Sequence, residues 1–358
     1  MIRCIARALL LLVTAALLAQ RAEAQERVRT HCNIFPVPHK GKFGYIDGSG
    51  KMVIQPRFDE AECFRDGRAR IAVKGLIGLM DARVGYIDLN GKLIGWAPDV
   101  EGWWLFSDGL AAFRDRGGVG YKDRGGRIVI APKYPLARQF SEGLAAVDAG
   151  ESGDWTQNWG FIDPTGRVVI PFGFSSVRSF HEGLAAVTVR EKGVHGLFKQ
   201  GVIDRSGKLV IAPQAWFIED DFSEGLVAVE TGEKWPQYTR WGYINRKGVW
   251  VIPPRFHYGR RFSEGLAAVD FPDEPGSPSR TGYTGYINKL GQTVIPPAFT
   301  AACPFENGLA MVHIGRQVGF VDRHGKFLWG PMEEPVYREG PEGDEPWPCP
   351  GMAYLPSP

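Results

Sequence analysis

The side chains that most often perform chemistry are present in this sequence, but they lack the spacing that a reactive site needs. None of the seven histidines stands in an H-x-x-x-H pattern and no two cysteines form a C-x-x-C pair, so the sequence offers no metal-ligand motif. No serine lies in a G-x-S-x-G turn, which is the setting of many nucleophilic serines. We therefore expect a protein that is not an enzyme and that holds neither a metal nor a cofactor.

Aspartates, by contrast, recur at regular positions. Each begins a segment Asp-x-x-Gly, at Asp47, Asp88, Asp123, Asp163, Asp204 and Asp322. Such a row could supply calcium ligands, but Asn245 and Asn288 replace the aspartate in two copies, which a turn tolerates better than a hard cation does. We therefore assign structural turns, closed by glycine at positive φ, to Asp47, Asp88, Asp163 and Asp204 with Gly50, Gly166 and Gly207.

Glutamates recur as well, each one directly before a glycine, at Glu142, Glu182, Glu224 and Glu264. The row could form an acidic stripe for a partner. Glu-Gly before a β-rich run is also typical of a turn. We expect turn residues that contact nearby backbone.

Tryptophans outside the regular positions are the best candidates for a binding surface. They are Trp103, Trp104, Trp155, Trp216 and Trp235, and we assign binding to the four other than Trp216. An exposed indole is costly unless it packs or binds, and its flat face suits sugar rings and peptide side chains. Local packing over irregular loops is the alternative explanation.

The regular positions belong to a repeat of about 40 residues. Gly-Tyr-Ile-Asp or a close variant begins at eight glycines that lie 41, 35, 40, 41, 41, 43 and 34 residues apart: Gly44, Gly85, Gly120, Gly160, Gly201, Gly242, Gly285 and Gly319. A second segment, Phe-Ser-Glu-Gly-Leu-Ala-Ala-Val or a close variant, precedes many of the copies. Short β-branched and aromatic runs bounded by turn formers predict strands, and no segment after the leader has a helical period. The pattern predicts an all-β fold of tandem hairpin or meander repeats.

These residues resemble the bacterial WG-repeat family, named for a Trp-Gly pair that stands intact at Trp159-Gly160 and Trp241-Gly242. The resemblance extends from about Phe43 to Gly330. It implies a β-repeat protein and brings no catalytic residues with it.

Two architectures can bury such a repeat: an open superhelical array, or a closed β-propeller of seven or eight blades. The repeats form one domain, 25-330, of about eight units that start near 33, 69, 110, 144, 184, 226, 266 and 309. The last copy has three strands of its own, and the segment from Asn33 to Val37 completes the first. Neither end has to share a blade with the other, so we favour the open array and keep the propeller as the alternative.

The two ends of the sequence differ from the repeats. Residues 1-24 read as a signal peptide, with Arg3 and Arg7 before the apolar run Ala8 to Ala19 and small residues before Gln25. Residues 331-358 contain eight prolines and six acidic residues and predict an extended tail. We therefore expect an exported protein, periplasmic or extracellular, with no integral membrane segment after cleavage.

Charge and cysteines agree with export. Removal of the leader changes 42 basic and 40 acidic residues to 39 and 39, because three arginines and one glutamate leave with it. A neutral protein has no overall field that attracts nucleic acid. Four cysteines remain and allow three pairings; the expected pairs are Cys32–Cys63 and Cys303–Cys349, one at each end of the array.

Taken together, the leader, the repeat and the missing catalytic motifs predict an exported scaffold, monomeric, that binds a protein or a cell-envelope glycan through its variable loops. A cell-envelope hydrolase or lyase on a propeller-like frame is the alternative, and a purely structural spacer is a third possibility.

Overall fold

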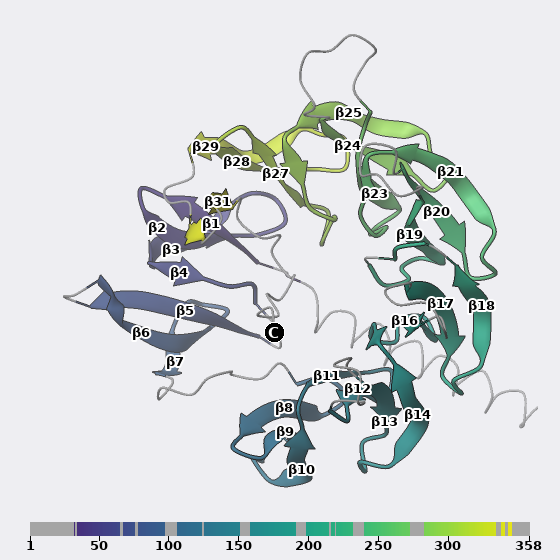
Figure 1. Ribbon diagram of the computed structural model, residues 1–358. Helices are drawn as coiled ribbons and strands as arrows, with labels where there is room; N and C mark the ends of the chain where they lie inside the picture. Colours follow the sequence, from purple (N-terminus) through teal and green to yellow (C-terminus); the bar gives the residue numbers. More distant parts are fainter. Residues whose placement is uncertain are drawn as a thin grey trace, which may run out of the picture. The chain divides into compact units, whose positions relative to one another are not determined.

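The structure is a computed structural model, and it describes residues 32, 34–64, 67–75, 78–96, 106–123, 125–150, 158–190, 198–214, 216–218, 220–231, 240–272, 283–333, 338–340 and 343–345. These residues form β-strands and turns without a helix (Figure 1). Among them, accordingly, no helix is long and apolar enough to cross a membrane. The chain divides into two compact units, Val100–Pro304 and Met1–Asp99 with Phe305–Pro358.

The unit Val100–Pro304 contains five antiparallel sheets, each drawn as a separate group of arrows in Figure 1. In hydrogen-bonded order the sheets are β10 (Ile128–Tyr134), β9 (Gly118–Asp123) and β8 (Leu110–Asp115); β11 (Ala137–Ser141), β12 (Leu144–Asp148), β13 (Trp159–Ile162) and β14 (Val168–Phe174); β15 (Ser176–Val177), β16 (Leu184–Arg190), β17 (Phe198–Asp204) and β18 (Leu209–Gln214); β19 (Leu226–Thr231), β20 (Arg240–Asn245) and β21 (Trp250–Phe256); β22 (Tyr258–Gly259), β23 (Leu266–Asp270), β24 (Thr284–Asn288) and β25 (Thr293–Phe299). The short strand β26 (Ala301–Ala302) ends this unit.

The other unit holds the first two repeats and the last one. Its strands are β1 (Phe35–His39), β2 (Lys42–Ile46) and β3 (Met52–Phe58); β4 (Glu60–Ala61), β5 (Arg68–Gly75), β6 (Gly78–Asp88) and β7 (Leu93–Trp96); β27 (Ala310–Ile314), β28 (Gln317–Val321) and β29 (Phe327–Glu333). A hairpin of β30 (Arg338–Gly340) and β31 (Gly343–Glu345) follows. The sequence predicted an extended tail here, but the two short strands pair antiparallel with Gly340 opposite Gly343.

Each repeat places its conserved segments on fixed strands. In the sheet of β15 to β18, the Leu-Ala-Ala-Val strand β16 pairs with β17, where Ala185 lies opposite Ile203 and Val187 opposite Gly201. The outer strand of a sheet bulges over the glycine of the Trp-Gly pair. A Cβ at Gly242 would stand 2.5 Å from the Ile252 carbonyl oxygen, so only glycine allows this close approach of two strands.

The hydrophobic core lies between consecutive repeats. One cluster joins Tyr121 and Ile130 of one repeat to Phe140, Ala145 and Ile162 of the next. Because the Leu-Ala-Ala-Val strand is covered by a neighbour on each side, all five residues of β12 are buried. This double cover explains why the strand reads as a continuous apolar run instead of an alternating one.

Aromatic rings repeat within each of these cores. The ring of the Gly-Tyr strand meets the phenylalanine of the next Phe-x-Glu-Gly segment edge to face, with centroids 4.8 Å apart for Tyr121–Phe140, Phe161–Phe180 and Tyr243–Phe262. Such tilted pairs stabilise a core by about 0.5–1.5 kcal/mol beyond the area that they bury. The consensus aromatics are thus structural.

In the unit that holds both, the first repeat packs directly on the last. The rings of Phe35 and Phe320 lie 5.4 Å apart, and a Cβ at Gly50 would stand 2.4 Å from the Leu328 carbonyl oxygen. An open superhelical array would keep its first and last repeats apart, so the architecture that we favoured is not confirmed. The eight sheets are the blades of a β-propeller, the alternative. Complete terminal copies do not discriminate between the two, because whole blades can meet without sharing a strand.

Candidate functional site

The repeated aspartates are engaged within their own turns. Oδ1 of Asp47 accepts hydrogen bonds from the backbone N–H groups of Ser49 and Lys51, at 2.9 and 3.1 Å. Asp88, Asp163 and Asp204 accept the equivalent pairs of bonds. The closing glycines Gly50, Gly166 and Gly207 have φ of 83°, 85° and 84°.

Electrostatics agree with this geometry. The Thr165 hydroxyl and the Arg167 side chain, together with the backbone N–H groups of both residues, lower the pKa of Asp163 to about 2. Among the residues that the structure describes, no group of three or more metal-ligating side chains gathers. The carboxylate of Asp163 therefore acts as a turn cap that is ionised at neutral pH.

The repeated glutamates occupy an uncommon backbone conformation. Glu142, Glu182, Glu224 and Glu264 have φ between 54° and 56°, and the glycine after each is also at positive φ. The residues flanking the Glu-Gly pair face each other in every copy: His181 and Leu184 bond in both directions, and Ser141 pairs with Leu144 where β11 and β12 meet. This is the geometry of a two-residue type I′ hairpin, which normally favours Asn-Gly. Glutamate is therefore a locally unfavourable choice that needs a compensating contact.

That contact comes from the next repeat. The carboxylate of Glu142 accepts the N–H of Gly183 at 2.7 Å, Glu182 accepts that of Gly225 at 2.8 Å, and Glu224 accepts that of Gly265 at 2.9 Å. Asp108 bonds Gly143 in the same way at 2.6 Å. We call this series the Glu–Gly ladder. The sequence predicted contact with nearby backbone, but the partner glycine lies 41 to 43 residues further along the chain from each of the three glutamates.

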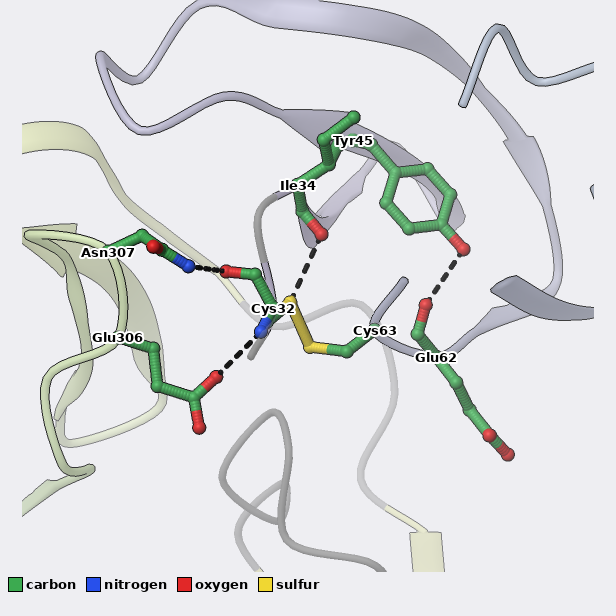
Figure 2. The surroundings of a disulfide bond; sticks show 7 residues. All are labelled: Cys32, Ile34, Tyr45, Glu62, Cys63, Glu306 and Asn307. Atoms are coloured by element: carbon green, nitrogen blue, oxygen red, sulfur yellow. Dashed lines mark hydrogen bonds between the residues drawn. A yellow bond between two sulfur atoms is a disulfide. The ribbon is translucent and has the colours of Figure 1, made fainter. Parts of the chain in front are cut away.

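A different arrangement joins the first repeat to the last. Figure 2 shows the backbone of Cys32 held at both ends: its N–H donates to Glu306 Oε2 at 3.2 Å, and its carbonyl accepts from Asn307 Nδ2 at 2.7 Å. Cys32 is also disulfide-bonded to Cys63, as the sequence predicted. Cys303 carries a disulfide bond too. Cys349 lies outside the described residues, so the Cys303–Cys349 pair stays a prediction.

Residues that vary among the repeats lie on β11 and directly after the short first strands β15, β22 and β26. Where the Gly-Tyr segment has a tyrosine, its hydroxyl can bond the carbonyl of the residue two places before the next conserved phenylalanine. Tyr121 does so with Arg138 at 2.6 Å, Tyr243 with Arg260 at 2.7 Å and Tyr286 with Cys303 at 2.7 Å. The repeat thus fixes the backbone at this position and leaves its side chain free to vary.

Charged side chains gather at this variable position, or close to it in the sequence, in four successive repeats. We call them the polar cluster: Arg138, Arg178, His181, Asp220, Asp221 and Arg261. Oδ2 of Asp221 lies 3.2 Å from His181 Nε2. Asp220 accepts the backbone N–H of Arg261 at 3.1 Å. Arg138 Nε and Asp221 Oδ1 are buried, and neither has a hydrogen-bond partner among the described residues.

The charges of the cluster influence one another. Burial raises the pKa of Asp221, against the opposing charges of His181 and Arg178. Burial and the like charge of Arg178 lower the pKa of Arg138, while Asp221 raises it. Such mutual perturbation of half-buried groups is typical of binding and catalytic sites, although structural ion pairs show it too.

The four tryptophans that the sequence singled out, Trp103, Trp104, Trp155 and Trp235, lie outside the described residues, so their role in binding stays a prediction. The polar cluster was not predicted from the sequence, because its residues belong neither to the repeated consensus nor to a known catalytic or metal-binding motif. The signal was present in the positions just before the conserved phenylalanine, where arginine, aspartate and cysteine replace one another from repeat to repeat.

Comparison with solved structures supports the fold. The chain is similar to a structure described as "the eukaryotic initiation factor", with 12% identity, a TM-score of 0.52, and coverage of 83% of this chain and 85% of that one. It is also similar to the β-propeller domain of the Trilobed protease from Pyrococcus furiosus, with 10% identity, a TM-score of 0.45, and coverage of 75% and 95%. At these identities the likeness concerns the fold alone, and the support comes from the first structure, whose TM-score is above 0.5.

Comparison at the level of sequence gives the family. No curated protein matches the chain. The model of the WG containing repeat matches residues 43–76, 120–150, 159–192, 201–235, 241–270 and 285–315, which is more than half of the sequence. The chain therefore belongs to the WG-containing repeat family.

Proposed function

We propose that this protein is an exported, non-catalytic repeat scaffold that binds a protein or a cell-envelope glycan. The observation that carries the proposal is the polar cluster, a group of half-buried charges that the repeat does not require. Consensus carboxylates are occupied in turns and in the Glu–Gly ladder, so they are poor candidates for contact with a partner. Charges that depart from the repeat are better ones, since stability alone gives no reason to gather them.

Export is supported by chemistry as well as by the apolar leader. The Cys32–Cys63 disulfide is typical of oxidising compartments, because cytosolic thiols are kept reduced. A scaffold in the periplasm or outside the cell would meet envelope glycans and secreted proteins first.

Binding can be tested by co-sedimentation of the purified protein with peptidoglycan sacculi, and by capture from a periplasmic extract. We expect wild-type protein to be retained, and the variant R138Q/R178Q/R261Q to lose retention. Arg127 and Arg167 are matched controls, since both are more than three-quarters exposed and bond aspartates of their own turns. R127Q/R167Q should bind as wild type does. The absence of wild-type retention in both assays would contradict a binding scaffold.

A second arm tests the variable loops. If Trp103, Trp104, Trp155 and Trp235 contribute flat binding faces, their replacement by alanine should weaken retention as well. Unchanged retention would remove the tryptophans from the proposed surface and leave the polar cluster.

The rival function, an envelope hydrolase or lyase, would have to use the His181–Asp221 pair, which lies at 3.2 Å and includes a carboxyl with a raised pKa. Incubation with sacculi and detection of released sugar or peptide fragments separates the two functions. We expect no release. Release that is abolished by H181A would establish the enzyme instead.

A further inference from the structure

We propose that Arg138 and Arg178 form a binding site for an oxyanion, the carboxylate or phosphate group of the partner. The proposal rests on the proposed function and names the chemistry by which the polar cluster would recognise its ligand.

Arg138 lies on β11, the first strand of its sheet, and Arg178 directly follows β15, the first strand of the next sheet. The repeat fixes the backbone of both. The carbonyl of Arg138 accepts the Tyr121 hydroxyl at 2.6 Å. The N–H of Arg178 donates to the Ala186 carbonyl at 2.8 Å. The two guanidinium groups are close enough for the charge of one to lower the pKa of the other. Fixed backbone in two neighbouring repeats thus carries two cations that influence each other.

Neither guanidinium forms a close ion pair with a residue that the structure describes, although the charge of Asp221 reaches both. Arg138 lies over the Trp159 ring, 5.6 Å from its centroid, and its Nε is buried without a hydrogen bond. Arg178 is half-buried and makes no ion pair with a described residue. Half-buried charges that repel each other are unfavourable unless an anion compensates them.

The nearest acids are committed elsewhere. Oδ2 of Asp221 faces His181, and burial raises the pKa of Asp221, which weakens it as a counter-ion. Asp220 accepts the backbone N–H groups of Asp221 and Arg261, at 3.3 and 3.1 Å. An excess of positive charge therefore remains on the Arg138 and Arg178 side of the cluster.

An equivalent position elsewhere in the molecule shows the ordinary solution. In an early repeat Glu62 stands two places before the conserved phenylalanine, and its carboxylate bonds Arg70 of the same sheet at 3.0 Å. A charge at this position can thus be neutralised within its own repeat. Arg138 and Arg178 are not neutralised in that way, and guanidinium groups bind carboxylate and phosphate in a bidentate, directional manner. An oxyanion of the ligand would neutralise these two guanidinium groups.

The test is a calorimetric titration of the purified protein with sodium phosphate and, separately, with sodium succinate, at constant ionic strength. We expect saturable binding of at least one of the two. R138Q and R178Q should each weaken it by roughly tenfold or more, the usual scale for a charged hydrogen bond. R127Q changes an exposed arginine and should leave it unchanged.

Two further variants separate recognition from a general loss of structure. R178K keeps the charge but loses the bidentate geometry, so it should weaken binding while the melting temperature stays at the wild-type value. D221N removes a competing carboxylate and should strengthen binding. Tighter binding of phosphate than of succinate would identify a phosphoryl ligand, and the reverse order a carboxylate; both support the site.

Absence of saturable binding by both anions, or equal affinities of wild type, R138Q and R178Q, would overturn the site. Retention on sacculi or by a periplasmic partner together with that result would leave the scaffold function standing and refute only the oxyanion site. Anion binding without retention on sacculi or by a periplasmic partner would support the oxyanion site and refute the scaffold function.

Discussion

The molecule joins its repeats in two different ways. Between consecutive repeats of the unit Val100–Pro304, one glutamate accepts one glycine N–H, as Glu182 does from Gly225. Between the first and last repeats, Glu306 and Asn307 hold both the N–H and the carbonyl of Cys32, and a disulfide ties that residue to Cys63. Consecutive repeats are already connected by a short stretch of chain, which keeps them close. The first and last repeats are far apart in the sequence, so stronger local contacts replace that connection.

Residues that depart from the repeat consensus are found where a repeat does something that the other repeats do not. At the first–last junction Asn307 stands where other repeats have glutamate, and it keeps the same positive φ, 48°. At the polar cluster, Arg138 and Arg178 stand where other copies have residues such as Glu62 and Cys303. Both places break the pattern while the backbone stays the same.

The largest expected effect comes from removing the Cys32–Cys63 disulfide, next to the contact between the first and last repeats. The variant C32A/C63A opens a covalent loop between residues that lie 31 apart, which should lower the free energy of unfolding by about 3–4 kcal/mol by the chain-entropy estimate. Denaturant unfolding followed by tryptophan fluorescence measures it. A midpoint equal to that of wild type would mean that the junction needs no covalent support.

The two kinds of hydrogen bond can be compared directly with E306A and E182A. Glu306 is buried, so its loss leaves the Cys32 N–H without an acceptor and should cost about 1–3 kcal/mol. Glu182 is half-buried, and E182A should cost about 1 kcal/mol. E182Q keeps an acceptor oxygen and should recover part of that. An equal loss of unfolding free energy in E306A and E182A would contradict the distinction between the first–last contact and the contacts of consecutive repeats.

Turn glycines offer a matched pair with a smaller effect. Gly50 and Gly207 have φ of 83° and 84°, so alanine suffers the same backbone strain of about 1 kcal/mol at either place. Its Cβ would stand 2.4 Å from the rigid Leu328 carbonyl oxygen at Gly50, but 3.1 Å from the Ile170 side chain at Gly207. We therefore expect G50A to melt at a lower temperature than G207A. A lower melting temperature for G207A than for G50A would show that the backbone around Leu328 shifts readily to accommodate the added Cβ.

The smallest effect concerns pH and the polar cluster. Because burial raises the folded-state pKa of Asp221 above its ordinary value, ionisation of Asp221 opposes folding. The penalty is absent at pH values below the unfolded-state pKa and grows as pH rises through the raised folded-state pKa. Around Asp221 lie His181, Arg178, Asp220 and Arg261. Wild type should lose stability relative to D221N as pH rises above the ordinary carboxyl range, as measured by melting temperature; a constant difference would refute this.

Much of the fold was predictable from the sequence. Repeat spacing and turn residues such as Asp163 and Gly207 identified the strands and hairpins, because turn chemistry is local. The packing of the first repeat on the last was not predictable, since the contact of Phe35 with Phe320 joins opposite ends of the sequence, which local patterns do not relate. The role of Glu182 was also hidden, because its partner belongs to another repeat.

The candidate site was less accessible. Arg138 and Arg178 occupy positions that vary among the copies, and single-sequence patterns emphasise what recurs. Only the packing of neighbouring repeats brings these two charges near each other, 40 residues apart in the chain. A comparison of the repeats at their variable positions would have identified both arginines before the structure.

The central claim is that the repeated carboxylates stabilise the fold while the polar cluster binds a ligand. Melting curves recorded with and without phosphate or succinate test it for two double variants, E142A/E182A and R138Q/R178Q. We predict that the first variant melts lower than wild type but keeps the increase in melting temperature caused by the anion. The second should melt at or above the wild-type temperature and lose that increase. A lower melting temperature for R138Q/R178Q with the anion-induced increase intact would contradict the account.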